Sequence, residues 1–288
     1  MSTATDTVRV GARRRPGVLA RSLAFTRRQT LTLFALLAFL YLLIPIAVVV
    51  AFSFNDPIGR FNFTWQGFTL DNWAHPFAYP DLRGAVQLSI EIAIASSIVA
   101  TALGTLMALA LVRYQFRGQG ATNFLIFLPM ATPEIVMGSS LLTLFLNFGD
   151  PFTLGFRTIL IAHIMFNISY VVVTVRARLA GYDRHLEEAA MDLFANPLTT
   201  FVKVTLPLIA PGILAAGLLS FALSVDDFVI TYLVSGADQT FPLFVWGAAR
   251  VAIPPQINVI GSAIFFIAVA LMLGNVVWQR TRQPKGAT

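Results

Sequence analysis

Two adjacent aspartates, Asp226 and Asp227, lie inside an apolar stretch that reads FALSVDDFVITYLVSG over residues 221–236. An ionised carboxylate in a low-dielectric environment costs several kcal/mol unless a partner or water compensates it. Because successive helical residues point about 100° apart, the two carboxylates cannot face the same way. A continuous helix would align Ser224, Asp227 and Thr231 in one polar stripe. We therefore expect Asp227 to face a wet pathway, whereas Asp226 pairs with a neighbouring helix or a partner subunit.

Further acidic residues also occur in apolar stretches. Glu134 follows Pro133, whose ring and missing N–H disrupt a helix locally, and Glu91 lies near the end of another apolar stretch. Such acids indicate a functional pathway by default, although buried ion pairs with arginine are the alternative. His163 and Asn167, four residues apart, suit interhelical hydrogen bonds and a pathway equally. The predicted pathway residues are Asp227, Asp226, Glu134, Glu91, Ser224 and Thr231.

The composition is that of a membrane protein. Of 288 residues, 57% are hydrophobic and 12% are charged, whereas a soluble domain has about 25% charged residues. Six stretches are long enough to cross a bilayer, which takes about 20 apolar residues. None alternates between apolar and polar residues as a membrane β-strand does. We predict an all-α polytopic protein with six transmembrane helices at about residues 30–54, 84–112, 121–148, 152–175, 206–235 and 257–279.

The basic residues predict the orientation. Only four of the 20 Lys and Arg residues fall in the loops of one side, and the other sixteen lie on the side of both termini. Cytoplasmic segments are enriched in Lys and Arg, so both termini are expected in the cytoplasm. This predicts a basic cytoplasmic tail at residues 1–29, a membrane domain at 30–279 and a second tail at 280–288. Because the positive charge follows topology, a nucleic-acid-binding role is disfavoured.

The cytoplasmic segment at residues 176–207 has the pattern of two short helices. Leu186, Ala189, Ala190 and Leu193 share one face at helical spacing, and Asn196-Pro197 ends that helix. Such amphipathic helices suit the membrane surface and a groove in another protein equally.

Intrinsic catalysis is not indicated. The chain has no cysteine, no GxxxxGK[ST] phosphate loop and no GxSxG motif, and its three histidines lack metal-ligand spacing. We therefore expect a transport subunit rather than an enzyme, with no cofactor and no metal in this chain.

The segment EEAAMDLFANPLTTFVKVTLP resembles the EAA motif of ABC-importer permeases. Glu188 and the two alanines after it match, as does Leu206-Pro207 at the family spacing, while Phe194 occupies the position of the motif glycine. That glycine permits a sharp turn, which Asn196-Pro197 is expected to supply here. The resemblance implies a coupling contact with an ATPase through Glu187, Glu188, Ala189, Ala190, Leu193, Phe194 and Pro207.

The stretches RYQFRG, PEIVMGSSLL, FNISYVVVTVRARL and LSVDDFVITYLVSG extend the likeness. They resemble the PotC-type permeases of spermidine/putrescine ABC importers. The resemblance implies the type I ABC importer permease fold in a bacterial inner membrane. It also implies a second, PotB-like permease, two PotA-like ATPase subunits that bind ATP and Mg, and an extracytoplasmic PotD-like polyamine-binding protein. An importer of another solute and a stand-alone secondary transporter are the alternatives.

Overall fold

The computed structural model describes residues 18–282, and this part of the chain is helical. Two isolated β-bridges, Asn55 with Phe68 and Phe61 with Ile253, occur within those residues in place of any strand. The predicted all-α class is confirmed. The helices are α1 (Val18–Phe52), α2 (Asp71–Ala74), α3 (Pro80–Arg113), α4 (Gln119–Ala131), α5 (Glu134–Phe148), α6 (Phe156–Ala180), α7 (His185–Asp192), α8 (Pro197–Thr200), the π-helical turn η1 (Phe201–Thr205), α9 (Leu206–Asp226), α10 (Val229–Val234), α11 (Phe241–Val251) and α12 (Pro255–Arg282).

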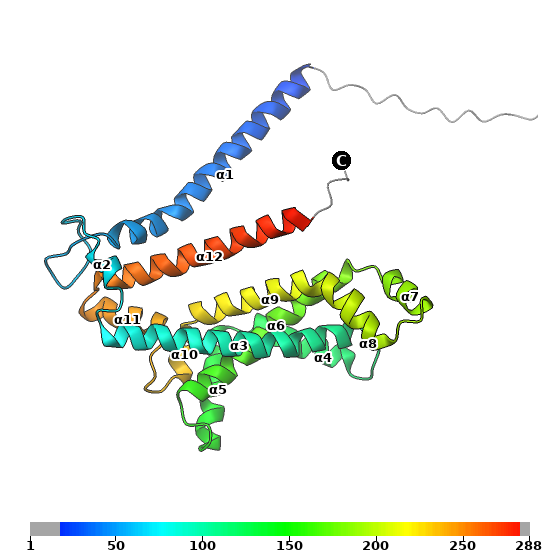
Figure 1. Cartoon of the computed structure of the whole chain (residues 1–288). Coiled ribbons are helices and arrows are strands. Elements are labelled where there is room, and N and C mark those ends of the chain that lie inside the picture. Colours follow the sequence, from blue (N-terminus) through cyan, green and yellow to red (C-terminus); the bar gives the residue numbers. More distant parts are fainter. Residues whose placement is uncertain (1–17, 283–288) are drawn as a thin grey trace, which may run out of the picture.

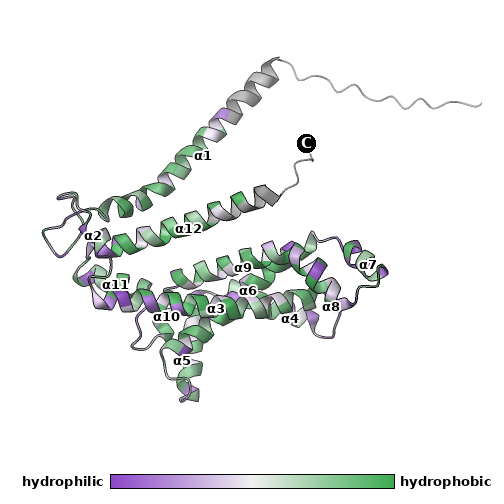
Figure 2. Cartoon of the chain, in the orientation of Figure 1, coloured by the Kyte–Doolittle hydropathy of each residue, from purple (hydrophilic) through white to green (hydrophobic). Residues whose placement is uncertain are grey.

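Helices α3, α6 and α9 pack against one another and form the centre of the molecule (Figure 1). Helices α1 and α12 make a separate pair, α7 and α8 lie at one end, and α2 and α11 lie at the opposite end. Apolar residues run along the long helices, as Figure 2 shows.

Close packing in the central helices depends on small residues. Ala100 and Ala108 of α3 and Ala216 of α9 are fully buried. A Cβ atom added at Gly104 would lie 2.7 Å from Cγ1 of Val171, which belongs to α6. Small side chains let membrane helices approach closely, so α3 and α6 meet at van der Waals contact here.

Four described helices are long and apolar enough to cross a membrane, and the number rises to five if the bent pair α4–α5 counts as one span. The four are residues Gln29–Phe52, Pro80–Arg113, Phe156–Ala180 and Pro197–Asp226. The first part of α12, Pro255–Leu271, is a shorter apolar segment. The chain is therefore a multi-pass membrane protein.

Two spans that were predicted as continuous helices are broken. The span predicted at 121–148 bends by 107° between α4 and α5, because Thr132 and Pro133 adopt extended backbone angles. The span predicted at 206–235 ends at Asp226, and the chain resumes as α10 after Asp227 and Phe228.

The two tails, at residues 1–29 and 280–288, stay predictions. Helix α1 begins at Val18, so residues 18–29 of the predicted tail are helical, whereas 1–17 lie outside the described residues. Helix α12 extends to Arg282, and the rest of the predicted tail at 280–288 also lies outside them.

We expect Gly104→Ala to destabilise the protein by about 1–3 kcal/mol, because the new methyl group overpacks the contact with Val171. Gly84→Ala, in the same helix, is the matched control. Nothing lies within 4 Å of its added Cβ, so this change is expected to be neutral or to stabilise α3 by up to about 1 kcal/mol. Thermal unfolding of the two purified variants in detergent checks the difference. Equal melting temperatures would contradict the close α3–α6 contact.

Candidate functional site

The site begins where the apolar helix α9 breaks. Asp227 has extended backbone angles, φ −64° and ψ 124°, so it leaves the helix that ends at Asp226. Its Oδ2 accepts hydrogen bonds from the backbone N–H of Thr231, at 2.8 Å, and from the Thr231 hydroxyl, at 2.6 Å. The carboxylate thus satisfies an N–H group in the first turn of α10 that has no partner within its own helix.

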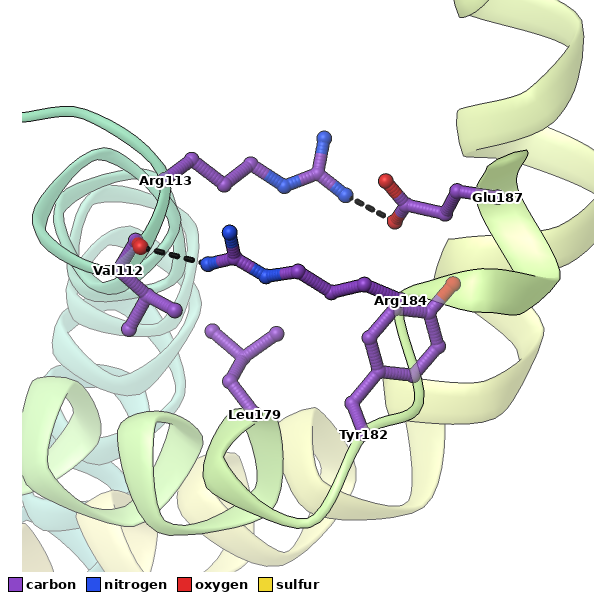
Figure 3. Close-up of a pocket in the computed structure, with 6 residues that line it drawn as sticks. All are labelled: Val112, Arg113, Leu179, Tyr182, Arg184 and Glu187. Carbon is purple, nitrogen blue, oxygen red and sulfur yellow. Dashed lines mark hydrogen bonds and ion pairs between the residues drawn. The ribbon is translucent and has the colours of Figure 1, made fainter. Parts of the chain in front are cut away.

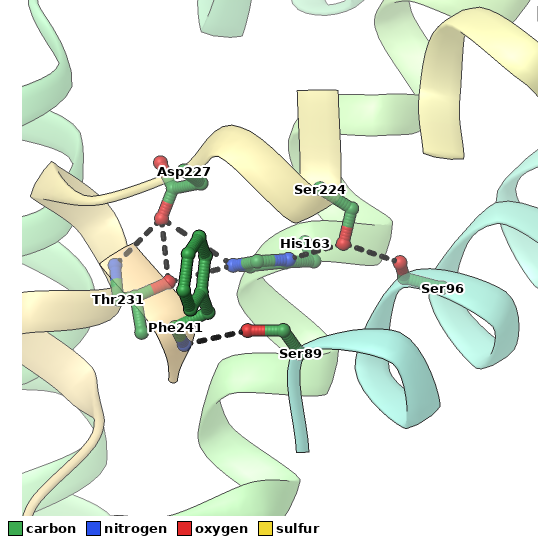
Figure 4. A network of polar contacts seen from close by, with 7 residues as sticks. All are labelled: Ser89, Ser96, His163, Ser224, Asp227, Thr231 and Phe241. Atoms are coloured by element: carbon green, nitrogen blue, oxygen red, sulfur yellow. Dashed lines mark hydrogen bonds and ion pairs between the residues drawn. The ribbon is translucent and has the colours of Figure 1, made fainter. Parts of the chain in front are cut away.

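His163 of α6 joins this break to the rest of the core (Figure 4). Its ring is 1% exposed. Nδ1 lies 2.6 Å from Oγ of Ser224, and Nε2 lies 2.9 Å from Oγ1 of Thr231 and 3.4 Å from Oδ2 of Asp227. Oγ of Ser224 is 3.0 Å from Oγ of Ser96, which belongs to α3. These five residues form the His163 network, and they tie α3, α6, α9 and α10 together.

One arrangement of protons satisfies every group in the His163 network. Thr231 donates its hydroxyl proton to Asp227, and so its oxygen accepts from Nε2–H of His163. Nδ1 is then an acceptor for the hydroxyl of Ser224, which in turn accepts from Ser96. A neutral imidazole with its proton on Nε2 has this one donor and one acceptor.

The structure brings three predicted residues together, but not on one continuous helix face. Ser224, Asp227 and Thr231 converge on His163 in the interior. The side chain of Asp227 is 6% exposed, whereas Asp226 is exposed. Asp227 therefore does not face a wet pathway, because the helix on which that prediction rested ends at Asp226, whereas the pairing of Asp226 with a partner subunit stays a prediction.

The other predicted acids lie apart from the His163 network. Glu134 is the first residue of α5 and is exposed. Glu91 is exposed on α3, where its Oε1 accepts from Nε2 of Gln87 at 2.7 Å. Their part in a pathway stays a prediction.

Sequence reasoning missed the central position of His163. The spacing of His163 and Asn167 suited interhelical hydrogen bonds, which His163 makes, but it gave no sign that the partners come from α9 and α10, more than 60 residues away. Asn167 is fully buried, and its amide atoms have no hydrogen-bond partner in the described part of the chain.

The segment with the EAA-like motif is fastened to the central helices. Glu187 of α7 forms an ion pair with Arg113, the last residue of α3, and accepts from Oγ1 of Thr205 at 2.5 Å. Nη2 of Arg184 donates to the carbonyl of Val112 at 2.7 Å (Figure 3). Pro207, the second residue of α9, follows η1 directly. These contacts join α7 to the end of α3 and, through η1, to the start of α9.

The remaining motif residues face outward. Helix α7 has no buried residue, and Leu193 and Phe194 are 82% and 99% exposed. The Glu188 carboxylate, which accepts from His185 at 3.0 Å, raises the pKa of His185 above its ordinary value.

The sharp turn after α7 occurs at Phe194, which has a φ of +64°. The motif position that favours glycine therefore keeps a left-handed conformation although its residue is phenylalanine. Asn196 has a different part, because its Oδ1 accepts from the N–H of Thr199 at 2.8 Å and caps α8. The prediction that Asn196-Pro197 supplies the turn was wrong.

The helical fold, the broken apolar helices and the anchored motif define a membrane component of a transport system. The chain belongs to the family described as binding-protein-dependent transport system inner membrane component, which matches residues 100–281. Two relatives narrow the likeness. The spermidine/putrescine transport system permease protein PotC of Escherichia coli (strain K12) is 37% identical over 249 residues, covering 86% of this chain and 92% of that protein. The putrescine transport system permease protein PotI of the same strain is also 37% identical, covering 84% and 87%.

Solved structures share the fold. A chain of a bacterial alginate ABC transporter, crystallised with an alginate pentasaccharide-bound periplasmic protein, superposes with a TM-score of 0.66 at 15% identity, covering 92% of this chain and 98% of that one. A chain of an amino acid ABC transporter with histidines gives a TM-score of 0.55 at 16% identity, covering 74% and 100%.

We expect Thr231→Val to lower the free energy of unfolding by about 1–2 kcal/mol, because it leaves Asp227 and His163 without their shared partner. Thr143→Val, on the exposed face of α5, is the matched control. Its hydroxyl donates only to the carbonyl of Ser139 in its own helix, so its loss is expected to change the melting temperature little. If the two variants have the same melting temperature in detergent, the His163 network does not stabilise the helix break.

Proposed function

We propose that this chain is a membrane-spanning permease subunit of an ABC importer that moves polyamines into the cytoplasm. The observation that carries the proposal is the 37% identity to two permeases whose names specify spermidine and putrescine, over more than four fifths of the chain. The structural neighbours support the fold alone, because they come from an alginate ABC transporter and an amino acid ABC transporter.

The charges of the chain suit a cationic substrate. Asp226, Glu91 and Glu134 are exposed carboxylates on apolar helices, where a second permease subunit would cover them. Such carboxylates replace water around ammonium groups, and weak binding at several sites lets the cation move onward. Asp227 would act indirectly, because its carboxylate already bonds to Thr231 inside the core.

The proposed topology has six spans, with α4–α5 as one bent span and α12 as the sixth. Both termini and the α7–α8 end would then lie in the cytoplasm of a bacterium, and α2 and α11 would face the extracytoplasmic side. A binding protein would deliver the substrate there.

Two ATPase subunits, which would bind ATP and Mg, are proposed to contact the α7–α8 end. Leu186, Leu193, Phe194, Leu198 and Val202 are all large, apolar and at least 46% exposed in this short segment. An apolar set of this kind favours a groove in a protein. The ion pair of Glu187 with Arg113 would then pass ATPase movements to α3.

The substrate proposal is tested on the complex of this chain with its second permease, ATPase subunits and binding protein, reconstituted in nanodiscs. Spermidine or putrescine is expected to stimulate ATP hydrolysis, and maltose is not. Asp226→Asn is expected to raise the half-maximal spermidine concentration about tenfold, since a hydrogen bond to a charged group contributes about 1.5 kcal/mol or more. Asp71→Asn, far from the proposed path, is the charge-matched control. Stimulation by maltose or an amino acid instead would support an ABC importer but contradict polyamines as its substrate.

Phe194 gives a separate test of the ATPase contact. Phe194→Gly and Phe194→Ala both remove the exposed ring, so both are expected to weaken binding of the ATPase subunits about tenfold or more. Only glycine relieves the left-handed strain of about 1–2 kcal/mol, so the free permease is expected to melt higher with glycine than with alanine. Phe148→Ala, an exposed phenylalanine at the end of α5, is the control for binding. Unchanged ATPase binding in both Phe194 variants would contradict the docking role.

A further inference from the structure

Residues of α2 and α11 line part of a cavity of about 670 Å³. These two helices lie at the end of the molecule opposite α7 (Figure 1). Its volume falls within the range of small-molecule sites, about 300–1,000 Å³. Four parts of the chain line it: the loop after α1, the segment from α2 to the first turn of α3, helix α11, and the first turn of α12. Neither the His163 network nor the α7–α8 end contributes to it.

Two carboxylates line this cavity from different elements. Asp56 follows α1 and Asp81 lies in the first turn of α3. Both residues are exposed, and within the described part of the chain neither carboxylate has a hydrogen bond or an ion pair. The aromatic rings of Tyr79 and Phe244 also line the cavity, and ring faces attract cations.

The wall of the cavity also holds an unpaired acceptor. Gln256 is 8% exposed, and its Oε1 is buried without a hydrogen-bond partner among the described residues. A buried carbonyl oxygen without a donor costs about 1–3 kcal/mol. The Oε1 atom is closed to the cavity in this structure, so it meets one of the three N–H donors of an ammonium group only after the Gln256 side chain turns.

The loop that carries Asp56 is held in place before any ligand arrives. The amide of Asn72 donates to the carbonyls of Ser53 and Asn55, at 3.2 and 2.8 Å. Asn55 in turn donates to Oδ1 of Asn62 at 2.6 Å and to the carbonyl of Thr64 at 2.8 Å. Such preorganisation reduces the entropy lost on binding.

We propose that this cavity binds a flexible organic cation with two or more ammonium groups, and that it receives this cation before the cation enters the membrane path. The proposal rests on the proposed function and extends it to a site at the α2–α11 end. Asp56 and Asp81 bind separate ammonium groups, Gln256 accepts a hydrogen bond, and the rings cover the methylenes. Arg60 also lines the cavity. Its positive charge opposes a cation there, whereas the two carboxylates favour one.

The first experiment measures binding of radiolabelled spermidine by equilibrium dialysis to the complex of this chain with its second permease and ATPase subunits in nanodiscs, without the binding protein. The double variant Asp56→Asn/Asp81→Asn is expected to bind at least about tenfold more weakly than wild type. Gln256→Leu is expected to weaken binding severalfold. Asp71→Asn removes one carboxylate charge on α2 outside the cavity, where Asp71 bonds to His75 at 3.0 Å, and is expected to bind as wild type does.

Arg60→Gln separates a cation site from an anion site. Removal of the arginine charge is expected to strengthen spermidine binding about two- to fivefold, because a repulsive cation is lost. Weaker binding in Arg60→Gln, unchanged binding in the double variant, or no saturable binding to wild type would each overturn the proposal.

A second pair of measurements separates this site from the proposed function and from a protein contact. If spermidine fails to stimulate ATP hydrolysis by the complete wild-type complex, the proposed function fails. If it stimulates wild type and the double variant equally at every concentration, only the cavity proposal fails. Co-sedimentation with ligand-free binding protein is expected to be the same for both. Its loss in the double variant would make the cavity a docking site for that protein and overturn the proposal.

Discussion

The structure depends on hydrogen-bond partners for the polar groups that are exposed where an apolar helix breaks. Within a membrane, no water is available for backbone N–H and C=O groups that leave a helix, so the protein itself must bind them. At the end of α9 the Asp227 carboxylate meets the N–H and the hydroxyl of Thr231. His163 then meets both Thr231 and Ser224. An apolar residue at any of these positions leaves a buried donor or acceptor without a partner.

The close packing of the central helices follows from the same requirement. Ser96 can contact Ser224 at 3.0 Å only if α3 and α9 approach closely. Gly217 of α9 permits this approach, since a Cβ there would lie 3.2 Å from Oγ1 of Thr101. The small residues and the polar network therefore support each other, because each contact requires the helix separation that the other maintains.

Much of the fold is readable from apolar length, because a bilayer demands spans of about 20 residues. The helical class and the family resemblance of the chain were predicted and are confirmed. The breaks were harder to locate. Pro133 was recognised as disruptive, but its ring says only that a helix is disturbed, and not that α4 and α5 diverge by 107°.

The orientation of Asp227 was beyond a sequence-based prediction for a related reason. Helical periodicity assigns a face to each residue only while the helix continues. Here the partners of Asp227 that end the helix include His163, 64 residues earlier in the chain. Phe194 is a comparable case. A phenylalanine side chain does not indicate a left-handed backbone, so only the glycine position that Phe194 occupies in the motif pointed to one.

Helix α3 connects the two ends of the molecule that the proposals concern. Its 34 residues form one uninterrupted helix, about 50 Å long at 1.5 Å per residue. Asp81 in its first turn lines the cavity, and Arg113 at its last residue holds Glu187 of α7. Helix α3 also packs along α6 and α9. A displacement that an ATPase subunit imposes on α7 would thus reach Asp81 through a single stiff element, so the affinity of the cavity for its cation and the state of the ATPase would be coupled. Coupling of this kind is reciprocal, and a cation bound at Asp81 would shift the ATPase contact by the same free energy.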